Sequence, residues 1–198
     1  MPKSHTTLGK VIHWTFILLY TYGILKQIDD LSQLQDNNLL IFEVIFATLF
    51  LFIVIARYIY MRRFETFQGA FQPVHKIHKY FAKTIHSSIY LCLIILPLTG
   101  LMIAGLYKQG YTDEEGLMLS SMMSLHGLAA DLSYLLILIH IVAAVWSRIK
   151  GEGVWASMVP LWKDESETNN EFIKKLSSLE NYFFNAIEGF FISKNKKV

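Results

Sequence analysis

The chain has 198 residues, of which 53% are hydrophobic and only 17% are charged, and its formal net charge is +2. Soluble domains carry about 25% charged residues, so this composition excludes an ordinary soluble protein and indicates an integral membrane protein. The single cysteine, Cys92, excludes an intrachain disulfide. No G-x-G-x-x-G or P-loop motif is present, and the small net charge does not suggest binding to nucleic acid.

Four apolar runs predict four membrane-spanning helices, since a bilayer requires about 20 residues per span. They cover residues 8–25, 39–61, 84–107 and 117–146. The first run carries His13 near its start, and the second carries Glu43 near its start and Arg57 near its end. A polar connector, residues 26–38, joins the two runs. Ionisable groups inside membrane spans are costly and usually functional, so these side chains are candidates for a site.

The third run follows a basic loop, residues 62–83, and has no formal charge. It holds His86 near its start, and Pro97 with Gly100 predicts a kink further along. Neighbouring helices in a bundle can satisfy the carbonyl group that a proline frees. A short acidic loop, residues 108–116, leads to the fourth run.

The fourth run carries His126 and His140, which are 14 residues apart. At about 100° and 1.5 Å per residue, the two imidazoles lie on nearly the same helix face and about 21 Å apart along the axis. One helix thus offers an imidazole at two depths of the bilayer. Asp131 points roughly away from His140, and we expect it to form an interhelical hydrogen bond, with a proton relay as the weaker alternative.

Lysine and arginine residues set the predicted orientation. Residues 1–10 hold two of them, residues 57–83 hold six and residues 148–163 hold three, whereas the connectors 26–38 and 108–116 hold one each. Under the positive-inside rule, both termini and the middle loop are cytoplasmic. The chain is therefore predicted to cross the membrane four times.

The tail, residues 163–198, has a different pattern from the spans. Its apolar residues recur at spacings of three and four, which predicts an amphipathic helix: Phe172, Leu176, Leu179, Phe183, Ile187 and Phe190. Such a helix can lie on the membrane surface, dock a partner protein or pack on its own bundle. The sequence leaves these three interpretations open.

Three histidines lie at the predicted cytoplasmic level: His13, His86 and His140. His126 lies at the other level, where the nearest polar group by depth is Glu43. Histidine is a standard ligand of haem iron, so the pattern favours stacked haems. Without a C-x-x-C-H motif, any haem must be held by coordination alone. The alternatives are interhelical hydrogen bonds by each histidine, or a zinc or copper site.

Two arginines lie near the cytoplasmic ends of spans, Arg57 in the second and Arg148 in the fourth. They are candidates to bind haem propionates by bidentate hydrogen bonds, but ordinary flanking of the spans explains them equally well. We expect His75 and His78 to be solvated in the basic loop.

Four segments carry a resemblance to a known family. They are VIHW at 11–14, ARYIYMRR at 56–63, HSSIYLCLIILPLTGLMIAG at 86–105, and LHGLAADLSYLLILIHIVAAVW at 125–146, followed by VWASMVP at 154–160. In their order and spacing, the chain resembles the bacterial cytochrome b561 family of four-helix di-haem proteins, a group that includes the b-type cytochrome subunits of Ni/Fe hydrogenases. The resemblance covers about residues 5–162.

The resemblance implies an all-α, transmembrane four-helix bundle in the bacterial cytoplasmic (inner) membrane. It further implies that this bundle binds haem b and exchanges electrons with a quinone, ubiquinone or menaquinone. It implies that His13 and His140 hold one haem. His86 matches a third-span histidine common in the family, either the ligand in place of His13 or part of a quinone site. His126 matches a ligand of a second haem.

Two departures from the family pattern affect these expectations. The second haem of the family has another histidine near the start of span two, where this chain has Glu43. The outer haem is therefore expected to be absent or to have unusual ligation. A histidine pair after the last ligand is replaced by Ser147 and Arg148, which weakens any inference about quinone chemistry from relatives.

The sequence thus predicts a cytochrome domain over residues 5–162 and a cytoplasmic amphipathic tail over 163–198. The predicted function is one-electron transfer through bound haem, with the lipid bilayer, a quinone and a redox protein as partners and a homodimer left open. One alternative is a haem-bearing membrane-anchor subunit of a larger dehydrogenase or hydrogenase. The other is a haem-free structural or metal-binding membrane protein.

Overall fold

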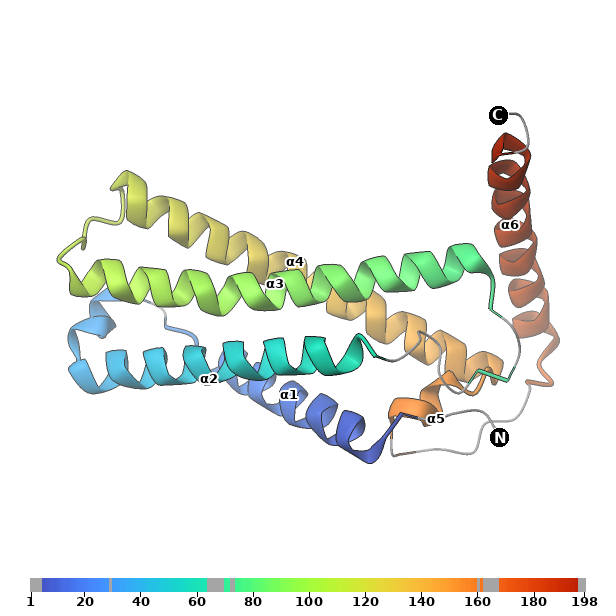
Figure 1. Cartoon of the computed structure of the whole chain (residues 1–198), viewed down its shortest axis with the longest axis horizontal. Helices are drawn as coiled ribbons and strands as arrows, with labels where there is room; N and C mark the ends of the chain where they lie inside the picture. The colour runs from blue at the N-terminus through green and yellow to red at the C-terminus, as the bar shows by residue number, and fades with distance from the viewer. Residues whose placement is uncertain are drawn as a thin grey trace. The chain divides into compact units, whose positions relative to one another are not determined.

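A computed structural model describes residues 5–28, 30–63, 70–71, 74–159, 161 and 168–195. Its helices are α1 (Thr7–Leu25), the short 3-10 helix η1 (Leu31–Gln35), α2 (Asn37–Met61), α3 (Lys76–Lys108), α4 (Leu117–Lys150), α5 (Val154–Met158) and α6 (Glu171–Asn195). Figure 1 shows them in chain order from blue to red. Within the described residues there is no strand, which confirms the all-α prediction.

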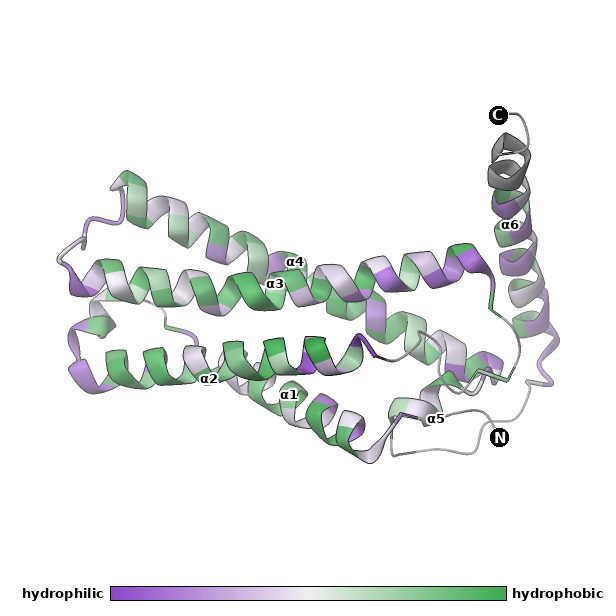
Figure 2. Ribbon diagram, viewed as in Figure 1, coloured by the Kyte–Doolittle hydropathy of each residue, from purple (hydrophilic) through white to green (hydrophobic). Residues whose placement is uncertain are grey.

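Four of the helices, α1 to α4, are long and apolar enough to cross a membrane. Figure 2 shows α2 as hydrophobic along most of its length, whereas α6 alternates between hydrophilic and hydrophobic residues. This contrast is the one that the sequence predicts between the spans and the tail.

The chain divides into two compact units. The bundle unit consists of Val11–Arg63 and Ser88–Ile137, and the tail unit consists of Met1–Lys10, Phe64–Ser87 and Leu138–Val198. Because α1, α3 and α4 each contribute to both units, the division falls within continuous helices.

The bundle unit packs four helices around an apolar core. Phe16 of α1, Phe50 and Val54 of α2, and Leu93 of α3 form one buried cluster. Helix α4 joins through Ser133, which is fully buried and lies 2.6 Å from the hydroxyl of Tyr20. The Ser133 hydroxyl donates to the carbonyl of Ala130 at 2.7 Å, so it accepts from Tyr20, and no polar group of this pair is left without a partner.

The second helix begins with a defined cap. The side chain of Asp36 accepts a hydrogen bond from the backbone N–H of Asn38, and Asp30 caps η1 in the same way through Ser32. Both carboxylates satisfy N–H groups that a helix start leaves unpaired. The polar connector therefore ends in two short capping turns rather than an extended loop.

The tail unit contains α5 and α6 together with the start of α3 and the end of α4. Here the structure differs from the prediction, because α3 begins at Lys76 rather than at residue 84. His75 and His78, expected to be solvated, are half-buried against α6 instead. The ring of Phe184 stacks on His78 with 5.0 Å between centroids. Packing by α6, which hydropathy does not report, explains both corrections.

Candidate functional site

His126 lies beside a cavity inside the bundle unit. The cavity has a volume of about 480 Å³ and is lined by residues of all four long helices. This volume is in the range of about 300–1,000 Å³ that is typical of ligand sites. Apart from His126, its polar lining residues are Tyr20, Lys26, Gln27, Glu43 and Tyr134, and the rest of the lining is mostly apolar.

The imidazole of His126 is held by Thr99 of α3. The Thr99 hydroxyl lies 2.9 Å from Nδ1 of His126, and it donates to the carbonyl groups of Ile95 and Leu96 at 2.8 Å and 2.9 Å. Because that hydroxyl proton is used on the backbone, Nδ1–H of His126 is the donor between the two side chains. The lone pair of the neutral imidazole is then on Nε2, the atom that would ligate iron.

Glycine keeps the space beside this imidazole open. A Cβ atom placed on Gly100 would lie 3.7 Å from Cε1 of His126, so a longer side chain there would extend into the cavity. Gly127, next to His126 in α4, also lines the cavity. The Nε2 donor atom, the oriented imidazole of His126 and the open space beside it together fit a planar haem that has this histidine on one side.

The opposite side of the cavity does not supply a second imidazole. Glu43, at the position where the family resemblance leads us to expect a histidine, forms an ion pair with Lys26. The Lys26 ammonium also lies 4.5 Å from the ring centroid of Phe46. A carboxylate paired with an ammonium is not among the common haem ligands. These residues therefore fit a haem with histidine on one side only.

His13 is bonded to Arg57 within the same unit. Nη2 of Arg57 lies 2.5 Å from Nδ1 of His13, and Nε of Arg57 donates to the hydroxyl of Tyr90 at 3.0 Å. A guanidinium can only donate, so Nδ1 of His13 accepts and the proton of the neutral ring lies on Nε2. Because Arg57 occupies Nδ1, Nε2 is the atom of His13 that would hold a haem iron.

His86 and His140 meet in the tail unit. Their ring centroids are 4.9 Å apart, with 66° between the ring planes. Two imidazoles on opposite sides of one iron have centroids about 6 Å apart, because each metal–nitrogen bond is about 2 Å long. In this arrangement the two rings contact each other and leave no room for a porphyrin between them. His86 and His140 are therefore direct neighbours in the tail unit.

Two other charged residues of the spans have defined surroundings. The Arg148 guanidinium lies over the ring of Trp155 in α5, with 5.6 Å to the centroid. Asp131, expected to form a buried interhelical hydrogen bond, is exposed on α4. Among the described residues there is no group of three or more His, Cys, Asp or Glu side chains that could hold a metal ion.

Thr99, Gly100 and Lys26 were not identified as site residues from the sequence. Thr99 and Gly100 follow Pro97 inside a segment that carries the family resemblance, and a hydroxyl in an apolar span is a signal for an internal hydrogen bond. Lys26 gives no such signal, because it directly follows α1 at the start of a polar connector.

Comparison with known families decides the identity. A sequence model described as prokaryotic cytochrome b561 matches residues 4–161. The chain belongs to this family. Neither the comparison with curated proteins nor the comparison with solved structures found a match. Membership of the prokaryotic cytochrome b561 family makes the protein a multi-pass bacterial membrane cytochrome of the b type that takes part in electron transfer.

Proposed function

We propose that this cytochrome carries single electrons through non-covalently bound haem, with His13 and His140 as the ligands of one haem. We further propose that the cavity beside His126 takes a second haem, ligated by histidine on one side. The observation that carries the proposal is the Thr99–His126 hydrogen bond at the edge of a cavity of about 480 Å³.

The pair His13 and His140 comes from the family resemblance and remains a prediction. The rings of His86 and His140 lie 4.9 Å apart, which is closer than the roughly 6 Å between two imidazoles on one iron and favours His13 as the partner of His140. We assign His86 the role of a neighbour that orients the imidazole of His140. Contact of this kind around a ligand tunes the electronic properties of the metal.

Haem iron, when bound, supplies a reversible one-electron step. The residues of this chain orient the ligand and form the surroundings of the site. Thr99 fixes the tautomer and ring orientation of His126, and the mostly apolar lining gives the site an apolar surrounding. Lys26 and Glu43 neutralise each other's charge at the same cavity. A quinone or a redox protein is the proposed partner that delivers or removes the electron.

The direct test is spectroscopy of the purified protein made with ample haem. We expect a b-type α band in the reduced-minus-oxidised spectrum and a pyridine haemochrome ratio between one and two haems per chain. Absence of the α band would overturn the proposal. Purification from native membranes tests the alternative, because an obligate anchor subunit would carry a soluble redox subunit with it.

A further inference from the structure

Helix α6 has one face that packs on the rest of the tail unit. Glu180 of this face accepts hydrogen bonds from Nε1 of Trp146 and Nζ of Lys150, each at 2.9 Å. Glu188 accepts from the backbone N–H of Lys76 at 2.8 Å and lies 3.4 Å from Nδ1 of His75. These contacts join α6 to the last turns of α4 and to the first turn of α3.

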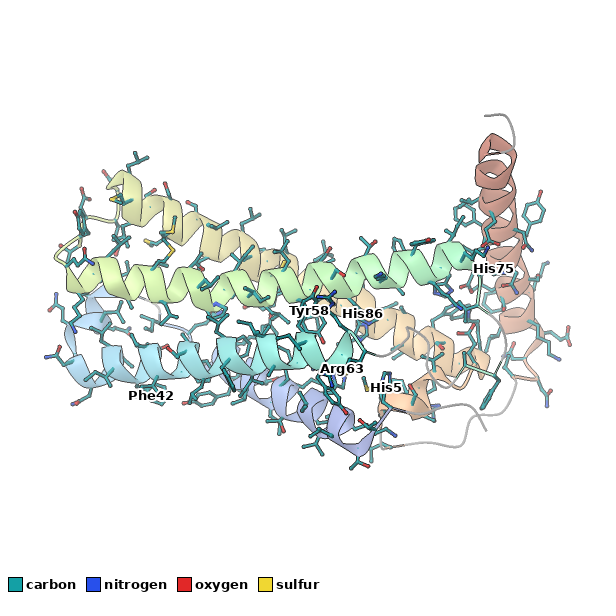
Figure 3. All side chains as sticks on the ribbon, viewed as in Figure 1. His5, Phe42, Tyr58, Arg63, His75 and His86 are labelled. Carbon is teal, nitrogen blue, oxygen red and sulfur yellow. The ribbon has the colours of Figure 1, made fainter. Side chains whose placement is uncertain are left out.

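The hydrogen bonds of Glu180 and Glu188 define the direction of α6. Glu180 meets the C-terminal end of α4, and Glu188, two turns further along α6, meets the N-terminal end of α3. Helix α6 therefore crosses the end of α3, as Figure 1 shows, and His75 lies beside it in Figure 3. Because α3 and α4 are membrane spans, a helix across their ends runs along the membrane plane.

A second face of α6 is apolar and exposed. Phe172, Leu176, Leu179 and Phe183 are 72%, 41%, 58% and 60% exposed. At about 100° per residue these four side chains share one face, roughly 100° around the helix from the anchoring face. Such a row of large apolar groups indicates a surface that contacts lipid or another protein.

The third face of α6 is polar and carries Glu171, Lys174 and Lys175 among the side chains that the structure describes. The other two acidic residues of the described part of the helix, Glu180 and Glu188, are used on the anchoring face. Lys174 and Lys175 outnumber Glu171, so the net charge left for a partner is positive, which complements an anionic lipid surface.

We propose that α6 is an interfacial membrane helix, whose face of Phe172, Leu176, Leu179 and Phe183 inserts into the leaflet at the start of α3. Lys175, about 70° around the helix from the centre of that face, binds the headgroups of anionic lipids there. Two observations favour lipid over protein as the occupant. The helix is held at the ends of two membrane-spanning helices, and the lysines on its polar face outnumber Glu171. The proposal is independent of haem binding.

Spin labelling of the full-length protein tests the proposal. A Cys92→Ser background removes the single native thiol. Nitroxides are placed at Leu176→Cys and Phe183→Cys, and at Ser178→Cys and Asn185→Cys as matched controls on the polar face. All four positions are exposed, so the labels should not disturb the fold. The protein is reconstituted into vesicles with equal amounts of phosphatidylcholine and phosphatidylglycerol.

We expect a ratio of oxygen to nickel-chelate collision rates several-fold higher at positions 176 and 183 than at 178 and 185. Equal, water-like ratios at all four positions would overturn the proposal. Low collision rates for both reagents at 176 and 183 would also overturn it, because they would show that protein covers this face. An unchanged ratio in vesicles of phosphatidylcholine alone would overturn the part assigned to Lys175.

Discussion

The hydroxyl of Thr99 and Nδ1 of His126 lie 2.9 Å apart and join α3 to α4 beside the cavity. The bond fixes which nitrogen of the imidazole carries the proton, since the hydroxyl proton is used on the backbone of α3. The third span, which has no formal charge over residues 84–107, thereby determines which nitrogen of His126 is available to a metal. The following predictions test this arrangement and the rest of the site.

Replacing Thr99 by valine removes the acceptor for Nδ1–H of His126 while keeping the shape of the side chain. Loss of such an outer partner typically costs about 10-fold to 100-fold in metal affinity, so we expect weaker haem binding and a shifted potential. Haem titration followed by redox potentiometry measures both. Thr99→Ser, which keeps the hydroxyl, is the control and should bind as the native protein does.

Gly100→Leu should fill the space beside His126 and prevent haem from entering the cavity. Gly105→Leu is the matched control, because nothing lies within 4 Å of a Cβ atom at that glycine of the same helix. In Gly100→Leu the haem-to-protein ratio should fall by the contribution of the outer haem. In Gly105→Leu the ratio should stay unchanged. Equal ratios in both variants would show that haem does not use this cavity.

Glu43→His should supply the second imidazole that the family pattern contains and this chain lacks. We expect the outer haem to gain occupancy and to change from high-spin towards low-spin, because iron then has six ligands. Electron paramagnetic resonance and the haemochrome ratio report these changes. Glu43→Gln breaks the ion pair with Lys26 without adding a ligand, so it separates loss of charge from gain of ligation. No change in the histidine variant would place Glu43 away from the iron.

His13→Ala and His86→Ala distinguish the two candidate partners of His140. If His13 is the ligand, its removal should abolish the low-spin signal of one haem, whereas His86→Ala should keep that signal and shift its potential. The reverse result would make His86 the ligand and would require its ring to separate from that of His140. Low-temperature difference spectra of both variants measure the outcome.

Acid should release α6 from the tail unit. Burial alone raises the pKa of Glu180, but the hydrogen bonds from Trp146 and Lys150 outweigh it and hold the pKa below its ordinary value of 4.5. The stabilisation by this carboxylate is therefore complete above pH 4.5 and is lost as the pH falls through the lower, folded-state pKa.

The mobility of a nitroxide at Ser178→Cys measures the release of α6 as a function of pH. Glu180→Gln should weaken the docking by about 1 kcal/mol, since the carboxylate is partly solvated and its charge is partly screened. In that variant the label should be more mobile at neutral pH, and the acid transition should be smaller. A transition of unchanged size would assign the acid effect to another group.

Hydropathy was sufficient to place the first two spans. Helix α1 begins at Thr7 and α2 ends at Met61, which agrees with the predicted runs to within one residue. The start of α3 was wrong because Lys76 to Lys83 are rich in charge and histidine, so no apolar run marks them. That segment is helical because α6 packs on it and caps it, and a contact between residues so far apart in sequence cannot be read from a local pattern.

The candidate site was predictable in its histidines but not in its partners. Spacing identified His126, and the family pattern identified Glu43 as a departure, but neither indicated that Lys26 would pair with that carboxylate. The contact between His86 and His140 was also not foreseen, since depth places residues at one level without fixing the distance between their rings. Distances between side chains on different helices depend on packing, which periodicity does not report.

The cap on α3 has a consequence for how the protein is made. Glu188 accepts the first backbone N–H of α3, although it follows that helix by more than a hundred residues. During synthesis the chain emerges from its N-terminus, so this carboxylate leaves the ribosome after all four spans have been made. Until then the first turn of α3 lacks its acceptor and is prone to fray. The hydrogen bond at the start of α3 can therefore form only after Glu188 has been made, and a chain truncated before Glu188 would lack that bond.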